Sequence, residues 1–239
     1  MKKYYPEGVI FQSRQNKKCM ESITSLRECC LSGKILEGKV TLCDREHNLY
    51  VDLGPIQGVI PREECAIGIS DGTVRDIAII SRVNKPVAFK IIDFMDDESG
   101  ERTAILSRKR VQEECAEEYI KNLTPGDIID AKITHIEGFG AFADIGAGLI
   151  ALMPIDAISV SRIPHPNVRF RVGDDIKAVV KDIAPDGKIL NNMGKKVGSI
   201  TEEVDVKWKH TRPAGFGCGI VRNDDFISAG LCPEVFKID

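Results

Sequence analysis

The sequence lacks several features that mark common classes of protein. No apolar run approaches the length of a membrane-spanning helix, and Lys2 and Lys3 are not followed by the apolar core of a secretory signal. There is no Gly-x-x-x-x-Gly-Lys-Ser/Thr loop, no His-Glu-x-x-His and no Gly-x-Ser-x-Gly motif. We therefore expect a cytoplasmic, non-enzymatic protein with no catalytic residues, cofactor, membrane contact or small-molecule substrate.

The spacing of cysteines that is typical of metal sites is also missing. Of the eight cysteines, no two form a Cys-x-x-Cys pair, and none pairs with a histidine at zinc-ligand spacing. The pattern favours buried or half-buried thiols in a reducing compartment. A zinc site would have to be assembled from distant segments, so we expect no metal ligands.

The chain has no excess of basic residues. Its formal net charge is −3, and only the first 33 residues, with six basic and three acidic side chains, are clearly basic. Bulk electrostatic attraction therefore cannot supply high affinity for a nucleic acid. Any such binding must depend on stacking, on local basic positions and on several modules that act together.

What the chain does contain is a repeat. Residues 39–61 run through an alternating segment, a turn, Tyr50–Gly54 and Gly58–Pro61, and the same order returns about 93 residues later in residues 132–154. Alternation of apolar and polar residues between glycine-bearing turns predicts half-buried strands. The repeat therefore predicts two duplicated modules, each with its own small core.

Each module is expected to contain five short strands, which describes a small antiparallel barrel. The last strand of the second module is expected at Ile189–Leu190. In the remaining tail, Gly219–Arg222 is similar to the start of a further module, so the tail is either a truncated module or a docking segment. The expected regions are a partly helical lead-in (1–33), a first barrel (34–110), a linker helix (111–124), a second barrel (125–190) and an irregular tail (191–239).

The modules resemble a known family, the RNA-binding domain named after ribosomal protein S-one. The resemblance is carried by residues 126–127, 136–145 and 169–176 of the second module and by Ile105–Lys109 at the end of the first. The arrangement is similar to that of short S-one homologues from Gram-positive anaerobes. The resemblance implies a mainly β fold of two tandem five-stranded barrels of the oligonucleotide/oligosaccharide-binding class. It also implies single-stranded RNA as the ligand, and mRNA at the small ribosomal subunit as the partner.

The sequence departs from the family at several positions. Proline stands at Pro61 and Pro154, where the family usually has a histidine after the third strand. Ala184 replaces the usual aspartate before the last turn, and Asn191 and Asn192 replace the closing Leu-Ser. The second module thus keeps its aromatic pair but loses part of its polar lining, and the first keeps a framework with a weaker stacking face.

The candidate RNA-binding residues lie in both modules. Phe139 and Phe142 flank a Gly140–Ala141 turn, where rings can stack on bases, although one of them, Phe142 more readily, can instead be core. His135 and His210 have no partner at useful spacing, which favours surface or packing roles. The residues expected to contact phosphate are Lys132, Arg162, His165, Arg169 and Lys188, and the comparable positions of the first module are His47, Tyr50, Lys90 and Arg102.

Other functions remain open at this level. A protein-interaction module that docks on a ribosome, nuclease or polymerase with little RNA contact is the main alternative. The acidic balance, the two prolines and the weak first stacking face favour it. An RNA-processing enzyme is a third interpretation, but no active site is visible in the sequence.

Overall fold

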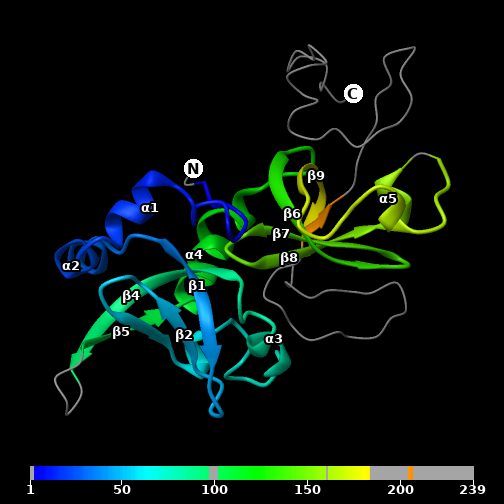
Figure 1. The fold of residues 1–239 in the computed structure, drawn as a ribbon. Coiled ribbons are helices and arrows are strands. Elements are labelled where there is room, and N and C mark those ends of the chain that lie inside the picture. Colours follow the sequence, from blue (N-terminus) through cyan, green and yellow to red (C-terminus); the bar gives the residue numbers. More distant parts are fainter. Residues whose placement is uncertain (1–2, 97–101, 160, 184–203, 207–239) are drawn as a thin grey trace.

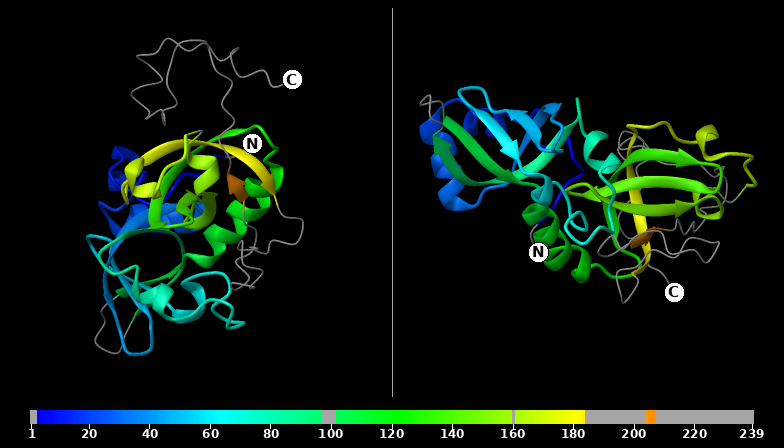
Figure 2. Two further views of the ribbon diagram at one scale, coloured as in Figure 1. Left: turned by 90° about the vertical axis from the view of Figure 1, so that its right-hand side faces the viewer. Right: turned by 90° about the horizontal axis from the view of Figure 1, so that it is seen from below.

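Alternating apolar and polar residues build two β units that lie side by side, joined through one helix (Figures 1 and 2). The structure is a computed structural model that describes residues 3–96, 102–159, 161–183 and 204–206. The protein is mainly β, as the repeat predicts. Within those residues, no helix is long and apolar enough to cross a membrane.

The lead-in contains two short helices, α1 (Arg14–Cys19) and α2 (Ile23–Ser32). The Ser22 hydroxyl accepts a hydrogen bond from the Ser25 backbone N–H and caps the start of α2. Gly33 ends the helix with φ of 60°, in the left-handed region that glycine adopts without strain. Buried Asn16 of α1 forms two hydrogen bonds with the backbone of Glu37 and so fixes α1 on the first barrel.

The first β unit is a closed barrel with the order β1-β2-β3-β5-β4. Its neighbouring strands are antiparallel except for β3 and β5, whose parallel pairing closes the barrel. The core is mainly aliphatic, with fully buried Leu36, Val51 and Leu106, and also contains Phe89 and two buried cysteines. The elements of this unit are β1 (Leu36–Cys43), β2 (Leu49–Asp52), β3 (Gln57–Ile60), η1 (Arg62–Glu64), α3 (Ile77–Ile80), β4 (Pro86–Asp96) and β5 (Arg102–Ser107).

The linker helix α4 (Lys109–Glu118) is followed by one turn, η2 (Ile120–Asn122). Its buried face carries Val111 and Cys115, which belong to the core of the second β unit, and the helix also contacts β4 of the first. Because one helix packs against both units, α4 is part of the junction between them and not an exposed spacer.

The second β unit is a curled five-stranded sheet with the order β10-β9-β6-β7-β8. β10 pairs with β9 and also contacts β8, which corresponds to the position of β5 in the first barrel. This strand comes from the segment expected to be irregular, while the expected strand Ile189–Leu190 lies outside the described residues. The elements are β6 (Ile128–Glu137), β7 (Gly140–Gly146), β8 (Leu149–Pro154), α5 (Ile155–Ile158), η3 (Pro166–Val168), β9 (Asp175–Ile183) and β10 (Val204–Val206).

The chain before α1 lies between the two β units, where it is dark blue in Figure 2. We call residues 4–11 the strap. The Tyr5 carbonyl accepts a hydrogen bond of 2.9 Å from the Ala147 backbone N–H in the second unit. The N–H groups of Gly8 and Phe11 donate to Glu37 Oε2 of the first unit at 3.0 and 2.7 Å. The strap therefore connects both units through its backbone.

A buried ion pair lies at the centre of this junction. Glu7 Oε1 accepts a hydrogen bond of 2.7 Å from Arg108 Nε, and Oε2 accepts one of 3.1 Å from Nη2. The side chains are only 5% and 3% exposed. Glu7 also accepts a bond from the Ala88 N–H, and its own N–H donates to Asp144 Oδ2 at 2.8 Å. One residue of the strap thus joins β4, the start of α4 and β7.

The carboxyl groups around this pair have opposite pKa shifts. Burial raises the pKa of Glu7, but the charge and hydrogen bonds of Arg108 outweigh burial and hold it below its usual value. Burial, helped by the charges of Glu7 and Asp144, raises the pKa of Glu37 to about 7. Burial and the charge of Glu7 raise the pKa of Asp144 to about 7 as well. The charged state of this junction therefore changes near neutral pH.

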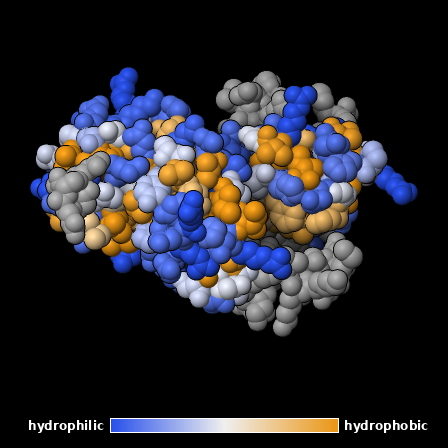
Figure 3. All heavy atoms as spheres, turned by 60° about the horizontal axis from the view of Figure 1, so that its bottom comes forward, coloured by the Kyte–Doolittle hydropathy of each residue, from blue (hydrophilic) through white to orange (hydrophobic). Residues whose placement is uncertain are grey.

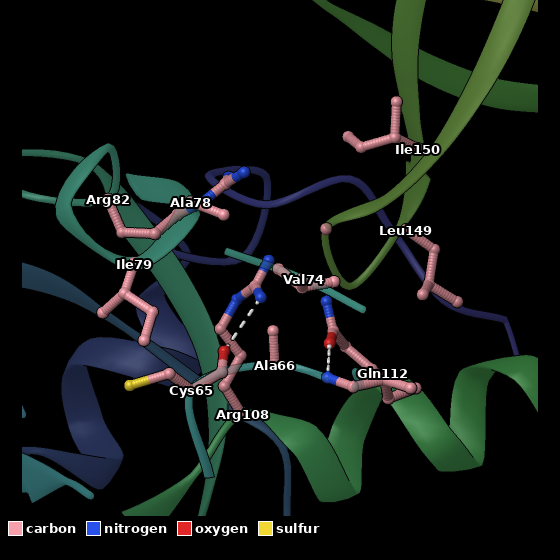
Figure 4. A pocket seen from close by; sticks show the side chains of 12 residues that line it. Cys65, Ala66, Val74, Ala78, Ile79, Arg82, Arg108, Gln112, Leu149 and Ile150 are labelled. Atoms are coloured by element: carbon pink, nitrogen blue, oxygen red, sulfur yellow. Dashed lines mark hydrogen bonds between the residues drawn. The ribbon is translucent and has the colours of Figure 1, made fainter. Parts of the chain in front are cut away.

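A small cavity of about 90 Å³ adjoins the ion pair, between the β3–β4 connection, α4 and the β7–β8 turn (Figure 4). Two side chains of its lining hold the β3–β4 connection. Arg108 Nη1 donates to the Cys65 carbonyl at 3.0 Å, and Gln112 Oε1 accepts from the Ile67 N–H at 3.1 Å. Gln112 Nε2 in turn donates to the Ala147 carbonyl of the second unit. The cavity is therefore framed by the same groups that join the units.

Removal of the Glu7 carboxylate should destabilise the protein strongly. Glu7→Ala leaves the Arg108 guanidinium buried without its counter-ion, and we expect a loss of about 3–5 kcal/mol in the free energy of unfolding. Denaturant titration measures it. Glu46→Ala, which removes an exposed acid in the β1–β2 turn, is the matched control and should change stability by about 0.5 kcal/mol or less. Equal effects of the two substitutions would contradict the role of the ion pair.

The raised pKa of Glu37 predicts a pH dependence. In the folded protein the pKa of Glu37 lies above the ordinary value of 4.5, so the unfolded chain loses this proton at a lower pH than the folded protein does. The stability contributed by protonated Glu37 is therefore fully present below pH 4.5 and is lost as the pH rises through about 7. The shift corresponds to roughly 3 kcal/mol for a fully buried group. Glu37→Gln, which stays uncharged, should flatten the decline in unfolding free energy between pH 4.5 and pH 8. A decline as steep as in the wild type would show that Glu37 does not titrate in this range.

Candidate nucleic-acid interface

Three aromatic side chains gather at the turn between β6 and β7. The rings of Phe139 and Phe142 meet edge to face with centroids 6.0 Å apart, and the His135 ring lies 6.1 Å from that of Phe142. We call these three residues the aromatic platform. Phe139 is 45% exposed, and Phe142 is half-buried. The platform therefore offers ring surface to a flat ligand.

Glycine is needed at Gly140, next to this turn, for a steric reason. A Cβ at Gly140 would lie 2.5 Å from the Met153 carbonyl oxygen, so β7 can approach β8 this closely only with glycine here. The Phe139 carbonyl accepts a hydrogen bond of 2.8 Å from the Ile155 N–H, which fixes the turn on the start of α5. The turn that carries the exposed ring is thus fixed by the close packing of Gly140 on β8 and by the hydrogen bond from Ile155.

His135 was not among the candidates from the sequence. A bulge between Ile133 and His135 shifts the register of β6 and places His135 opposite Phe142. His135 Nε2 also lies 2.7 Å from Glu137 Oε1. Since a bulge moves a side chain to the other face, only the cross-strand register reveals that His135 lies beside Phe142. Its exposed position and its ring contact agree with the surface or packing role expected from the sequence.

The residues predicted to contact phosphate in the second module differ in their position and burial. His165 lies beside the platform turn, because its Cδ2 is 3.9 Å from the place of a Cβ on Gly138. Arg162 is exposed, and Arg169 is half-buried after η3. Lys132 lies on β6, 3.3 Å from Asp175 Oδ1. Lys188 is outside the described residues.

The candidates of the first module all have acidic neighbours. His47 Nδ1 lies 3.9 Å from Asp76, and the Tyr50 hydroxyl donates to Asp44 at 3.2 Å. Lys90, whose side chain is 15% exposed, forms an ion pair with Glu114 of α4. Arg102 pairs with Asp96 at 2.6 Å. Intramolecular carboxylates thus lie beside all four candidates of the first module, and Lys132 of the second module is paired in the same way. The exposed ring of Phe139 makes the second module the better candidate site.

Pro61 and Pro154 have the same structural role in the two modules. Pro61, with φ of −58°, directly precedes η1, and Pro154, with φ of −61°, directly precedes α5. The fixed φ of proline suits the entry into a helical turn. Both prolines therefore start the helical element that follows the third strand.

The described part of the chain holds no group of three or more His, Cys, Asp or Glu side chains that could bind a metal ion. The thiol groups of its six described cysteines are all free.

The chain is similar to several curated proteins and solved structures. The small ribosomal subunit protein bS1 of Staphylococcus aureus is 28% identical over 213 residues, which cover 87% of this chain and 48% of the relative. The bS1 protein of Staphylococcus haemolyticus is 28% identical over 225 residues, with 88% and 54% covered. The chain thus spans about half the length of these curated relatives. A multidomain protein with nucleic acid binding domains from Streptococcus pneumoniae is 12% identical, with 82% of this chain and 59% of that chain covered and a TM-score of 0.28.

The family described as S1 RNA binding domain matches residues 32–109 and 122–191, which together make up more than half of the chain. Each match contains one copy of the repeat and the strands of one β unit, except β10, which lies beyond the second match. The chain belongs to the S1 RNA-binding domain family.

Proposed function

We propose that this protein binds single-stranded RNA, without chemistry, mainly through its second S1 domain. The aromatic platform carries the proposal, because it presents the half-exposed Phe139 ring on a fixed turn next to Phe142 and His135. A base that stacks on such a ring contributes about 1–3 kcal/mol and needs no particular sequence. Unpaired bases expose the ring faces that this requires, whereas duplex RNA does not.

The basic groups near the platform position the RNA backbone. His165 adjoins the turn, and Arg162 and Arg169 belong to the same connection between β8 and β9. Such contacts orient a nucleic acid without reading its sequence. They support RNA binding that is modest in strength and broad in sequence.

The partner we propose is mRNA at the small ribosomal subunit. Support comes from the relatives of this chain, which are small ribosomal subunit proteins. Co-sedimentation with small subunits tests this partner, and a chain that stays in the supernatant at low salt contradicts it.

The first S1 domain is better suited to protein contact. Its candidate RNA-binding groups are paired with acids, and Ile77 and Ile80 of α3 are 67% and 44% exposed. On the face shown in Figure 3, hydrophobic side chains form separate patches among hydrophilic ones. We propose that this domain contributes little to RNA affinity and supports the second domain as a docking module.

Phe139→Ala should weaken binding to a short unstructured RNA by about 1–3 kcal/mol, the loss of one stacked base. Folding should be spared, because the ring is 45% exposed. His47→Ala is the control in the first domain and should change affinity little. RNA affinity and thermal midpoint, measured together, separate the two effects, which Phe142→Ala is expected to mix. Normal RNA binding by Phe139→Ala would favour the interaction-module alternative.

The affinity should depend only weakly on salt. Few phosphate contacts are available, and each contributes about −0.7 to the slope of log K against log salt for a single strand, so we expect a slope shallower than about −3. Fluorescence anisotropy across a salt series measures it. A steeper slope, or a preference for duplex RNA, would overturn the stacking mechanism.

A further inference from the structure

A group of basic side chains lies on α1, outside the matched S1 domains. Arg14, Lys17 and Lys18 are three and four residues apart, so they share one face of this helix. All three are exposed, and we call them the basic face. Together with Gln12 and Glu21 they line a shallow open cleft of about 600 Å³. The lining of this cleft therefore carries three positive charges and one negative charge.

The opposite side of α1 fixes the direction of these charges. Asn16 is buried and forms two hydrogen bonds with the backbone of Glu37 on β1, at 2.7 and 3.0 Å. The Ser13 hydroxyl caps the helix by accepting the Asn16 N–H at 3.1 Å. Because Asn16 is directed at the barrel, the basic face is directed away from it, on a helix that is anchored at both its cap and its buried side.

The charges of the basic face have no partner inside the protein. Within the part of the chain that the structure describes, no carboxylate forms an ion pair with Arg14, Lys17 or Lys18. In the first barrel, by contrast, Lys90 is paired with Glu114 and Arg102 with Asp96. The basic groups of the lead-in are therefore available to an external anion, whereas those two are not.

Helix stability does not explain this arrangement. Lys17 and Lys18 lie in the last turn of α1, where the helix dipole favours a cation, but Arg14 lies in the first turn, where it does not. Like charges three and four residues apart on a helix also repel each other. The fold thus keeps a repulsion on α1 that a bound anion would relieve.

We propose that the basic face is a second RNA contact, which binds phosphates of the same single strand whose bases stack on the aromatic platform. Because the ligand is RNA, this assignment rests on the proposed function. An arginine can hold a phosphate through two parallel hydrogen bonds, and a lysine does so as a point charge. In Figure 1, α1 lies by the first barrel, whereas β6 and β7, which carry the platform, belong to the other unit. A strand must therefore extend beyond one domain to reach both contacts.

RNA suits this face better than an acidic protein does. A strand that is already held at the platform reaches the basic face at a raised effective concentration, and an untethered acidic partner lacks this advantage. The contact is also expected to depend on RNA length. The shallow salt slope applies to a short RNA, which reaches the platform alone, and the phosphate contacts of the basic face add to the slope for a long RNA.

The test uses oligouridine of about 6 and about 30 nucleotides, because one barrel of this class covers about 4–16 nucleotides. The basic-face variant combines Arg14→Gln, Lys17→Gln and Lys18→Gln in the full chain. We expect it to lose roughly tenfold in affinity for the long RNA at about 50 mM salt and to match the wild type near about 200 mM, because three phosphate contacts add about −2 to the slope of log K against log salt. Its affinity for the short RNA should equal that of the wild type.

The matched control removes the same charge from exposed positions elsewhere, by combining Arg45→Gln, Arg75→Gln and Arg110→Gln. It should keep the wild-type affinity for the long RNA. The thermal midpoints of both variants should stay close to that of the wild type, because every replaced side chain is exposed. Equal losses in the two variants would show a general effect of charge and overturn the proposal, as would normal binding of the long RNA by the basic-face variant.

Two further measurements separate the alternatives. Poly-aspartate that binds the wild type as tightly as the long RNA, and loses this binding in the basic-face variant, would assign the face to an acidic protein instead. Phe139→Ala tests the platform by itself. If it leaves binding of the short RNA unchanged while the basic-face variant still loses the long RNA, the platform is rejected and the basic face stands. A wild type that binds neither RNA overturns both.

Discussion

The buried pair of Glu7 and Arg108 determines how the two S1 domains are held. Its partners are about one hundred residues apart, so the pair exists only when the strap, the end of the first barrel and α4 have come together. Two charges removed from water are costly unless every hydrogen-bonding group finds a partner. Here Arg108 also binds the Cys65 carbonyl, and Glu7 also accepts from Ala88. The ion pair thus specifies one arrangement of the two domains, because another would leave these charges without partners.

The two copies of the repeat have diverged around equivalent aspartates. Asp52 ends β2 and Asp144 lies two residues before the end of β7, and each accepts a hydrogen bond from a glycine N–H two residues later. Asp52 is exposed, whereas the second oxygen of Asp144 accepts the N–H of Glu7. Asp52 thus stabilises its own turn, whereas Asp144 also takes part in the domain junction. A similar division holds for the candidate site, since aromatic rings gather in the second module and acids pair with the basic groups of the first.

The sequence predicts features that depend on local patterns. Alternation and glycine turns identify the β units. The turn beside the aromatic pair lies at Gly138–Phe139, whereas Gly140 and Ala141, where the sequence places it, begin β7. The strap could not be predicted, because Glu7 looks like any surface acid and its partners are far away in the chain. The contact of His135 with Phe142 could not be predicted, because it depends on a bulge in β6. β10 was missed because three residues in a tail without clear alternation carry no signal of their own. In each case a long-range contact or a register shift decided the outcome.

The strap lies outside the region that the family match covers, which begins at residue 32. The two S1 segments therefore do not include all the residues that hold the two domains together. The first S1 domain cannot simply be exchanged for another of its kind, because a replacement would need an arginine where Arg108 stands and a carboxyl group to receive the strap where Glu37 does. The order of the two domains is constrained in the same way, since only the second turns its aspartate toward Glu7. The sequence of this chain is thus built from repeated modules, but a few residues before the first module restrict which residues each module can carry at the junction.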